Sequence, residues 1–512
     1  VVIGYGTQDK EKFNGAVSKI NNEALNEYST ANFEQAMIGR IAGVQVFSNG
    51  KNPGDNSVIQ IRGLNTLTAG TDPLIVVDGN PLTEGSSMSS INTNDIESVS
   101  VLKGAASAAI YGSRASSGVI FISTKRGTPG KLKVTYDGYV GVQKRMDKFE
   151  LTDAYQTALF DNDARNFGYL SGGAGRSIND DNATRDANGG GKRSRIPDYL
   201  QGYLDGTPEL TNTNWQDEVF RTARQESHYI NLSGGTEQSD YSISFGFLDQ
   251  ENIIIDSDYK RYTNNIRFNT QVSKMVRFGV NTNLSYTDAN LTGERAWSSS
   301  RLGFKQQADP AYSVVLMQPY YPITNADGSL AIAAQLDDNN DNWDGPISEN
   351  TIAQTKLTDF LRTGFRAFGN TFVEIEPIEN LTFKTMFGGD YETSSEEYFG
   401  PSTIGDYRTP VEDNNTKASL YNTERENYIT ENTLTYMKTF GVHTFELLGG
   451  YSYQQELWSR TSQESEDFAD DNIRNIGGAT SVNSTLQSSK WALESYFSRL
   501  QYVFDGRYSL SA

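Results

Sequence analysis

The sequence predicts two structural units in series: an α+β domain over residues 1–130 and a large antiparallel β-sheet of the membrane-barrel kind over residues 131–512. The apolar runs of the first unit are short, and most are followed by a turn signal. The strands of the second unit are long and alternate apolar with polar residues. They are joined by very short turns at one end and long polar segments at the other, which is typical of an outer-membrane barrel.

Composition allows this fold class and excludes several others. The 512 residues include 28 Tyr, 25 Phe and 47 Gly but only 13 Pro, which favours β structure. No apolar run reaches about 18 residues, so a helical membrane protein is excluded. The net charge of −20 argues against a nucleic-acid partner, and the absence of Cys excludes disulfides and thiolate metal sites. A large soluble β protein stays open on composition alone.

The first unit is expected to contain short helices and strands. A helix is predicted from the N-cap Asn32 to a stop at Gly39–Gly43. Strands are predicted at 44–47, 58–61, 74–77, 96–102 and 119–122, with a small-residue helix at 105–110.

The second unit is expected to contain roughly ten strands, recognised by their alternation. In one of them Tyr241, Ile243 and Phe245 alternate with Ser242 and Ser244. Short turns near 273–275, 376–380 and 441 face long polar loops at about 290–360, 393–425 and 456–488, which we expect to be extracellular. A barrel that surrounds a folded domain has about 22 strands, so we expect the barrel to continue beyond Ala512.

Several ordered segments of the first unit resemble the plug domain of TonB-dependent outer-membrane receptors. They are Ile61-Arg62-Gly63, Leu74-Ile75-Val76-Val77-Asp78-Gly79, the run from Ile96 through Lys103-Gly104 to Tyr111-Gly112-Ser113-Arg114, and Gly118-Val119-Ile120-Phe121-Ile122-Ser123-Thr124-Lys125. A narrower resemblance is to the SusC/RagA branch, the Bacteroidetes importers of glycans or peptides. It rests on Val1-Val2-Ile3-Gly4-Tyr5-Gly6-Thr7, Gly39–Val46 and Thr124–Gly127.

The resemblance implies active import of a nutrient across the outer membrane. In this family the plug closes the barrel, and the TonB–ExbB–ExbD complex uses the inner-membrane proton gradient to pull on an N-terminal segment. The implied partners are a SusD-like surface lipoprotein as a lid, outer-membrane lipid, and a glycan or peptide substrate. A siderophore or cobalamin receptor of the same fold is the first alternative, and a surface β adhesin is the second.

Candidate TonB contacts are the apolar, β-prone Val1, Val2 and Ile3, which would pair with TonB as an added strand. The alternative is that these residues form the first plug strand or a disordered terminus.

The plug motif supplies residues that we expect to shape or lock this domain: Arg62, Gly63, Asp78, Gly79, Lys103, Gly104, Tyr111 and Gly112. The glycines are expected at turns that need positive φ. A buried Arg62 would pair with a barrel carboxylate and lock the plug; its alternative is a local ion pair with Asp78 or Glu97. Lys103 is expected to be solvated.

Candidate contacts to the substrate or the lid are aromatic residues in the predicted loop 290–360: Trp297, Tyr312, Tyr320, Tyr321 and Trp343. Aromatic faces suit both sugar rings and peptides. The alternative for each is packing within the loop.

No enzyme and no cofactor are predicted. His228 and His443 are the only histidines and lack metal-ligand spacing, and Gly172–Gly175 predicts a flexible loop rather than a phosphate site. The run Asp337–Asp341 is rich in oxygen ligands but does not have EF-hand spacing, so a loop Ca²⁺ site is kept as a minor alternative.

Overall fold

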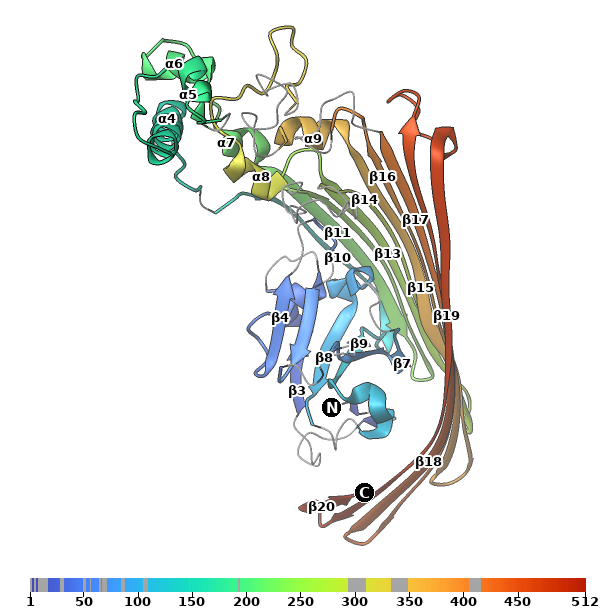
Figure 1. Cartoon of the computed structure of the whole chain (residues 1–512). Coiled ribbons are helices and arrows are strands. Elements are labelled where there is room, and N and C mark those ends of the chain that lie inside the picture. The colour runs from blue at the N-terminus through green and yellow to red at the C-terminus, as the bar shows by residue number, and fades with distance from the viewer. Residues whose placement is uncertain are drawn as a thin grey trace.

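A large curved sheet partly surrounds the N-terminal domain, and several helices gather at one end of that sheet (Figure 1). The computed structural model describes residues 2–3, 6–7, 17–27, 32–48, 52–55, 57–63, 66, 71–83, 88–104, 109–146, 148–191, 194–292, 310–332, 349–404 and 416–512. Among these residues, no helix has the length and apolar content needed to cross a membrane.

The N-terminal domain is built on a five-stranded sheet in the order β3 (Val17–Asn21), β8 (Ile96–Leu102), β9 (Val119–Thr124), β6 (Leu74–Val77) and β7 (Asn80–Pro81). Only the β6–β9 pair is parallel. A separate hairpin joins β4 (Val44–Ser48) to β5 (Ser57–Ile61), and β1 (Val2–Ile3) pairs with β2 (Gly6–Thr7). The five predicted strands of this domain are confirmed.

The helix predicted after Asn32 is shorter in the structure, and the other described helices of this domain are also short. They are α1 (Asn22–Leu25), α2 (Phe33–Ala36) and the 3₁₀ turns η2 (Met88–Ser90), η3 (Thr93–Asp95) and η4 (Ala109–Ala115). Asn32 is the N-cap residue of α2, but its side chain makes no capping hydrogen bond. Of the helix predicted at 105–110, residues 105–108 lie outside the described part of the chain.

The large sheet has eleven strands, each hydrogen-bonded to the next along the chain and all antiparallel, where roughly ten were predicted. They are β10 (Gly130–Gln143), β11 (Ala223–Gly235), β12 (Ser239–Glu251), β13 (Asp258–Ser273), β14 (Val276–Asn290), β15 (Asp359–Ile378), β16 (Leu381–Gly400), β17 (Lys417–Phe440), β18 (His443–Phe468), β19 (Ala479–Phe504) and β20 (Tyr508–Ser511). Each strand pairs with the next one along the chain, some through tight turns and others through long segments, and this order is the meander of a membrane barrel.

The sheet is polar on its inner face and apolar on its outer face. Along β13 the buried inward residues include Asn265 and Arg267, whereas Tyr262, Ile266 and Phe268 are exposed on the outside. Aromatic side chains lie directly opposite one another across the outer face of β11–β14: His228, Phe247, Tyr262 and Tyr286. Such an apolar outer face with an aromatic row suits contact with lipid.

Two of the predicted loops, 393–425 and 456–488, have wrong boundaries at both ends. The segment between β14 and β15 agrees with the loop predicted at 290–360, but β16 continues to Gly400 and β17 already starts at Lys417. Likewise β18 continues to Phe468 and β19 starts at Ala479. The ends of these strands carry polar residues on both faces, as in Thr393–Glu397, so the alternation used for prediction disappears there while the backbone ladder continues.

Helices were also missed in the connection between β10 and β11. This segment contains α4 (Ala154–Ser171), α5 (Asn182–Ala187), α6 (Asp198–Leu204) and α7 (Trp215–Val219). A capping box between Asp153 and Gln156 starts α4, and Gly172 is its C-cap residue rather than part of an extended flexible loop. The segment before β15 adds α8 (Pro310–Leu316) and α9 (Thr351–Leu357), which pack with α7 at the end of the sheet that carries the long connections (Figure 1).

Candidate functional site

The turn between β6 and β7 holds the N-terminal domain against the inner face of the sheet. Asp78 has a φ of 48°, and the backbone N–H of Thr124 donates to its Oδ1 at 3.0 Å. The hydroxyl of Thr124 donates to Oδ2 at 2.6 Å, so the carboxylate also fixes the end of β9. These two contacts lie within the N-terminal domain, so they position the turn without help from the large sheet.

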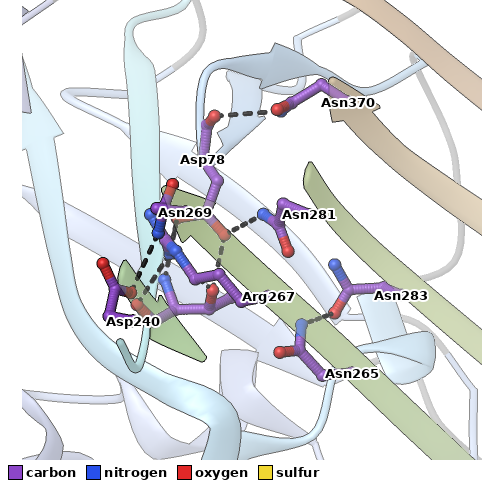
Figure 2. A network of polar contacts seen from close by, with 9 residues as sticks. Asp78, Asp240, Asn265, Arg267, Asn269, Asn281, Asn283 and Asn370 are labelled. Atoms are coloured by element: carbon purple, nitrogen blue, oxygen red, sulfur yellow. Dashed lines mark hydrogen bonds and ion pairs between the residues drawn. The ribbon is translucent and has the colours of Figure 1, made fainter. Parts of the chain in front are cut away.

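The partner in the sheet is Arg267 of β13. Its Nη1 lies 2.8 Å from Asp78 Oδ1, with the two side chains 8% and 4% exposed. The same nitrogen donates to the carbonyl and hydroxyl of Thr124 at 3.0 and 2.9 Å. Asn281 of β14 donates to Asp78 Oδ2, and Asn370 of β15 donates to the Asp78 carbonyl at 3.0 Å (Figure 2). One turn is therefore bound by three adjacent strands.

Two asparagines of the domain fit over glycines of the sheet. Asn80 donates to the carbonyls of Gly369 and Gly389 at 3.3 and 3.1 Å, and a Cβ on Gly388 would lie 2.6 Å from its Oδ1. Asn92 donates to Thr263 at 3.2 Å. Glycine is needed at 388 because a side chain there would occupy the space of the Asn80 amide.

A buried carboxylate, Asp95, makes a further contact. The hydroxyls of Tyr229 at 2.9 Å and Ser244 at 2.5 Å donate to its Oδ1 from β11 and β12. Burial raises the pKa of Asp95 to about 6, and the two hydrogen bonds only partly oppose that shift. This contact therefore changes its charge in mildly acidic solution.

Glu34 of α2 is a second buried carboxyl group. No other residue that the structure describes forms a hydrogen bond with its carboxyl oxygens. Burial raises the pKa of Glu34 to about 7, and a hydrogen bond from its own backbone N–H and the charge of Arg261 act in the opposite direction. Arg261 comes from β13 and donates to the Ser89 carbonyl at 2.7 Å. Two carboxyl groups of the domain are thus held close to the sheet in an environment that favours their neutral forms.

A cavity of about 490 Å³ lies between the domain and strands β14–β17. The domain contributes Pro53–Asp55 and Ser89–Ser90, and the sheet contributes mainly polar and charged side chains. Arg362 of β15 bridges Asp55 at 2.9 Å and Glu396 at 3.0 Å. Deeper in the wall, Arg366 forms a two-point ion pair with Asp390 at 2.9 and 2.7 Å. The cavity is large enough for a few sugar or amino-acid units.

The comparisons with known proteins agree with this architecture. The family described as the TonB-dependent receptor plug domain matches residues 9–119. TonB-dependent receptor P3 of Formosa agariphila is 32% identical over 99% of this chain and 45% of the relative. TonB-dependent receptor SusC of Bacteroides thetaiotaomicron is 28% identical over 99% of this chain and 47% of the relative. The chain belongs to the family of TonB-dependent receptors of the SusC/RagA type. It spans about half the length of these relatives.

A solved structure shares the fold. The RagAB peptide importer in its open-open state matches with a TM-score of 0.74 at 24% identity, covering 99% of this chain and 55% of that chain. The N-terminal domain is therefore called the plug below, and the large sheet the barrel sheet.

The expected lock between plug and barrel exists, but with the charges reversed. Arg62 is exposed at φ 60° and forms no ion pair with a carboxylate among the described residues, so its predicted pairing with the barrel, Asp78 or Glu97 is wrong. Asp78 of the plug supplies the negative charge and Arg267 of the barrel the positive one. The alternating strand pattern already places Arg267 on the inner face, but only the three-dimensional packing shows which inward residue lies opposite the turn.

The other motif residues mostly shape the plug. Gly63, Gly79 and Gly112 have positive φ, whereas Gly104 is not among the described glycines that do. Lys103, which was expected to be solvated, is half-buried and donates to Ser18 at 2.7 Å and to the Ala42 carbonyl. Tyr111 packs on Phe121 with ring centroids 5.6 Å apart.

The predicted substrate aromatics are only partly within the described residues. Tyr320 and Tyr321 are 7% and 4% exposed in a cluster with Trp215, which corrects the expectation that they face a ligand. Tyr312 on α8 is exposed. Trp297, Trp343 and the Asp337–Asp341 run lie outside the described residues. Of the candidate TonB contacts, Val2 and Ile3 form β1, and Val1 is outside the described part.

Proposed function

We propose that this receptor imports an oligopeptide or glycan across the outer membrane in a TonB-dependent cycle, with a SusD-like lipoprotein as its lid. One observation carries the proposal: the plug is bound to the barrel sheet largely by hydrogen bonds and ion pairs, including Asp78–Arg267 and Asp95–Tyr229. Polar contacts of this kind can be exchanged for water when a force moves the plug, and they can re-form afterwards. The named relatives, SusC and the RagAB peptide importer, support the choice of cargo classes.

The force would act through the N-terminal segment. Figure 1 marks the N-terminus on the side of the plug away from the helices, which suits access from the periplasm. Val2–Ile3 already form a short strand with Gly6–Thr7, so this backbone adopts the extended conformation that strand addition by TonB requires. We therefore keep Val1, Val2 and Ile3 as proposed TonB contacts, with ExbB–ExbD supplying the energy.

The lid would bind at the opposite, helical end. Helix α4 buries Ala154 and Ala158 but exposes five apolar side chains, Tyr155, Leu159, Phe160, Phe167 and Leu170, within an arc of about 140° that also carries Asp163. Exposed apolar surface of this kind is typical of an interaction site. It supports a protein partner at this end, and the relatives make a SusD-like lipoprotein the partner that we propose.

A disulfide lock tests plug movement directly, because the chain has no native Cys. The side chains of Asn92 in the plug and Thr263 in the barrel meet at 3.2 Å, so the thiols of Asn92→Cys and Thr263→Cys would lie within reach of a short bis-methanethiosulfonate cross-linker, which joins them through two disulfides. In the complete receptor, the cross-linked double variant should stop uptake of the cargo and a reductant should restore it, while each single variant transports normally. Uptake that persists with the cross-link fully formed would refute plug movement.

The cargo is tested by growth of a strain lacking the receptor on a panel of peptides and glycans, with and without TonB. Loss of growth on one nutrient class that also requires TonB would support the proposal. If only siderophore-bound iron or cobalamin uptake is lost, the cargo assignment is wrong although the transport class stands.

A further inference from the structure

An arginine in the wall of the cavity between plug and barrel is partly exposed and contacts a carboxylate from each of the two. The guanidinium of Arg362 is 34% exposed and contacts Asp55 of the plug, which is 22% exposed, as well as Glu396. By contrast, Arg366 and Asp390 are each 3% exposed and paired with one another, and Arg366 also donates to Ser90 of the plug at 3.2 Å. Of these two arginines, Arg362 is the one that a ligand can reach with less desolvation.

Among the described residues that line the cavity, the charges balance: Arg362, Arg366 and Arg425 are positive, and Asp55, Glu392 and Glu396 are negative. Asp390, which is paired with Arg366 behind this lining, adds one more negative charge to the wall. Strand register fixes this pattern, since Glu392 of β16 lies directly opposite Arg366 on one side and Arg425 on the other. An anion that simply added to the cavity would make its lining net negative, which Coulomb repulsion opposes.

An anion that replaces Asp55 keeps the balance. Asp55 lies in the short segment between β4 and β5, and its Oδ2 also accepts from the backbone N–H of Asn52 at 3.2 Å. The carboxylate therefore keeps a partner within its own segment when it leaves Arg362. The Asp55–Arg362 pair is partly exposed, and pairs of that kind are weak enough to be displaced.

We propose that Arg362 binds a carboxylate of the cargo in exchange for Asp55, so that occupancy of the cavity loosens the plug segment 52–55 at the barrel wall. The ligand class is an oligomer that carries a carboxylate, either the C-terminus of a peptide or a uronic acid of a glycan. The inference rests on the proposed import function and adds its substrate chemistry and a coupling between cargo and plug. The coupling is reciprocal: cargo binding weakens the Asp55–Arg362 contact by the same free energy by which breaking that contact strengthens cargo binding.

The segment loosened by the exchange also contacts the barrel at a second point. Asn52 Oδ1 accepts from the backbone N–H and the hydroxyl of Thr292 at 3.0 Å each. Loss of the Asp55 contact would leave this neutral contact in place. The exchange therefore loosens the segment without detaching it, which keeps the cavity closed until force is applied.

The test measures binding to the complete receptor by titration calorimetry with four probes: an oligopeptide with a free C-terminus, its C-terminal amide, an oligosaccharide ending in glucuronate, and the same oligosaccharide ending in glucose. At least one acidic probe should bind about ten-fold more tightly than its neutral counterpart, as expected for a charge-assisted hydrogen bond. The pair that shows the difference identifies the source of the carboxylate. Equal binding within both pairs, or no binding of any probe, would overturn the inference.

Two variants with opposite expected effects separate the exchange from general damage to the fold. Arg362→Gln should remove the preference for the acid, whereas Asp55→Asn should tighten binding of the acidic probe about two- to five-fold because its competitor is gone. The matched control is Asp505→Asn, which neutralises an exposed carboxylate 3.6 Å from Arg507 at a β-turn and should change nothing. Weaker acid binding by Asp55→Asn would refute the exchange.

Hydrogen exchange supplies the second readout. The acidic probe should speed exchange of the amides in 52–55 in the native receptor but not in Arg362→Gln. TonB-dependent uptake of neutral probes without any acid preference would leave the import function standing and overturn this inference alone. Acid-selective binding without TonB-dependent uptake would support the exchange at Arg362 and overturn the import function.

Discussion

Neutralising Asp78 is expected to loosen the plug within the barrel sheet while leaving the sheet folded. Asn tolerates the positive φ of 48° at this position, so Asp78→Asn changes the charge without straining the turn. The loss leaves Arg267, 8% exposed, as a buried cation whose remaining partners include the two oxygens of Thr124. Removing one partner of a buried ion pair costs about 3–5 kcal/mol, so the open state of the turn should become at least about a hundred-fold more populated.

Hydrogen exchange of the detergent-solubilised complete receptor measures this opening. Amides of residues 71–83 should exchange faster in Asp78→Asn, while those of β13 and β14 remain protected. Asp390→Asn is the matched control, because it breaks an equally buried pair that lies within the barrel sheet, with Arg366. A double variant, Asp78→Asn with Arg267→Met, should recover part of the protection since no unpaired charge is left. Unchanged exchange in 71–83, or the same increase in Asp390→Asn, would show that the pair does not hold the plug.

Two further predictions concern the same interface. The stability of the docked plug should fall as pH rises from about 4 to 7. Burial raises the pKa of Glu34 from 4.5 to about 7 and that of Asp95 from 3.8 to about 6. The folded state therefore binds more protons in this window than the unfolded state, and it loses this advantage as pH rises. Each group contributes roughly 3 kcal/mol to this change, and Glu34→Gln or Asp95→Asn should flatten the pH profile of the thermal midpoint; a native profile that rises over the window contradicts the assignment. Gly388→Ala should displace Asn80 and increase exchange in the β6–β7 turn, because the new Cβ would lie 2.6 Å from the amide oxygen, whereas Gly389→Ala, whose nearest atom is 3.9 Å away, should be tolerated; equal effects would refute the close fit.

Much of the fold could be predicted from residue patterns alone. The strands of the plug are bounded by Gly-containing turns, as at Asp78-Gly79, and several barrel strands are joined by very short connections. Both kinds of strand can therefore be recognised in the sequence. Alternation failed where neither face is apolar. Residues such as Glu392–Glu397 of β16 extend the ladder toward the helical end without any hydrophobic signal. The helix α4 was missed although its capping box, Asp153 and Gln156, and the helical spacing of apolar residues such as Leu159 can be read from the sequence.

The candidate site was predictable in kind but not in its partners. The motif around Asp78 marked the turn that docks, and alternation marked Arg267 as inward-facing. Which inward residue meets which plug residue depends on how high the plug lies in the barrel and on strand register, and neither quantity leaves a local trace in the sequence. The same holds for the cavity, where Asp55 and Arg362 are separated by 307 positions along the chain.

Phe368 has a consequence for how this receptor is assembled. Its ring comes from β15 of the barrel sheet, yet it is buried as part of the plug's own apolar core, in the cluster that contains Val99 and Ile120. The plug thus lacks one hydrophobic group until it meets the wall around it. Chain order favours synthesis of the plug first, but its interior is complete only after the hairpin β15–β16 has formed. We therefore expect the core of the plug to be completed only when β15 lies beside it.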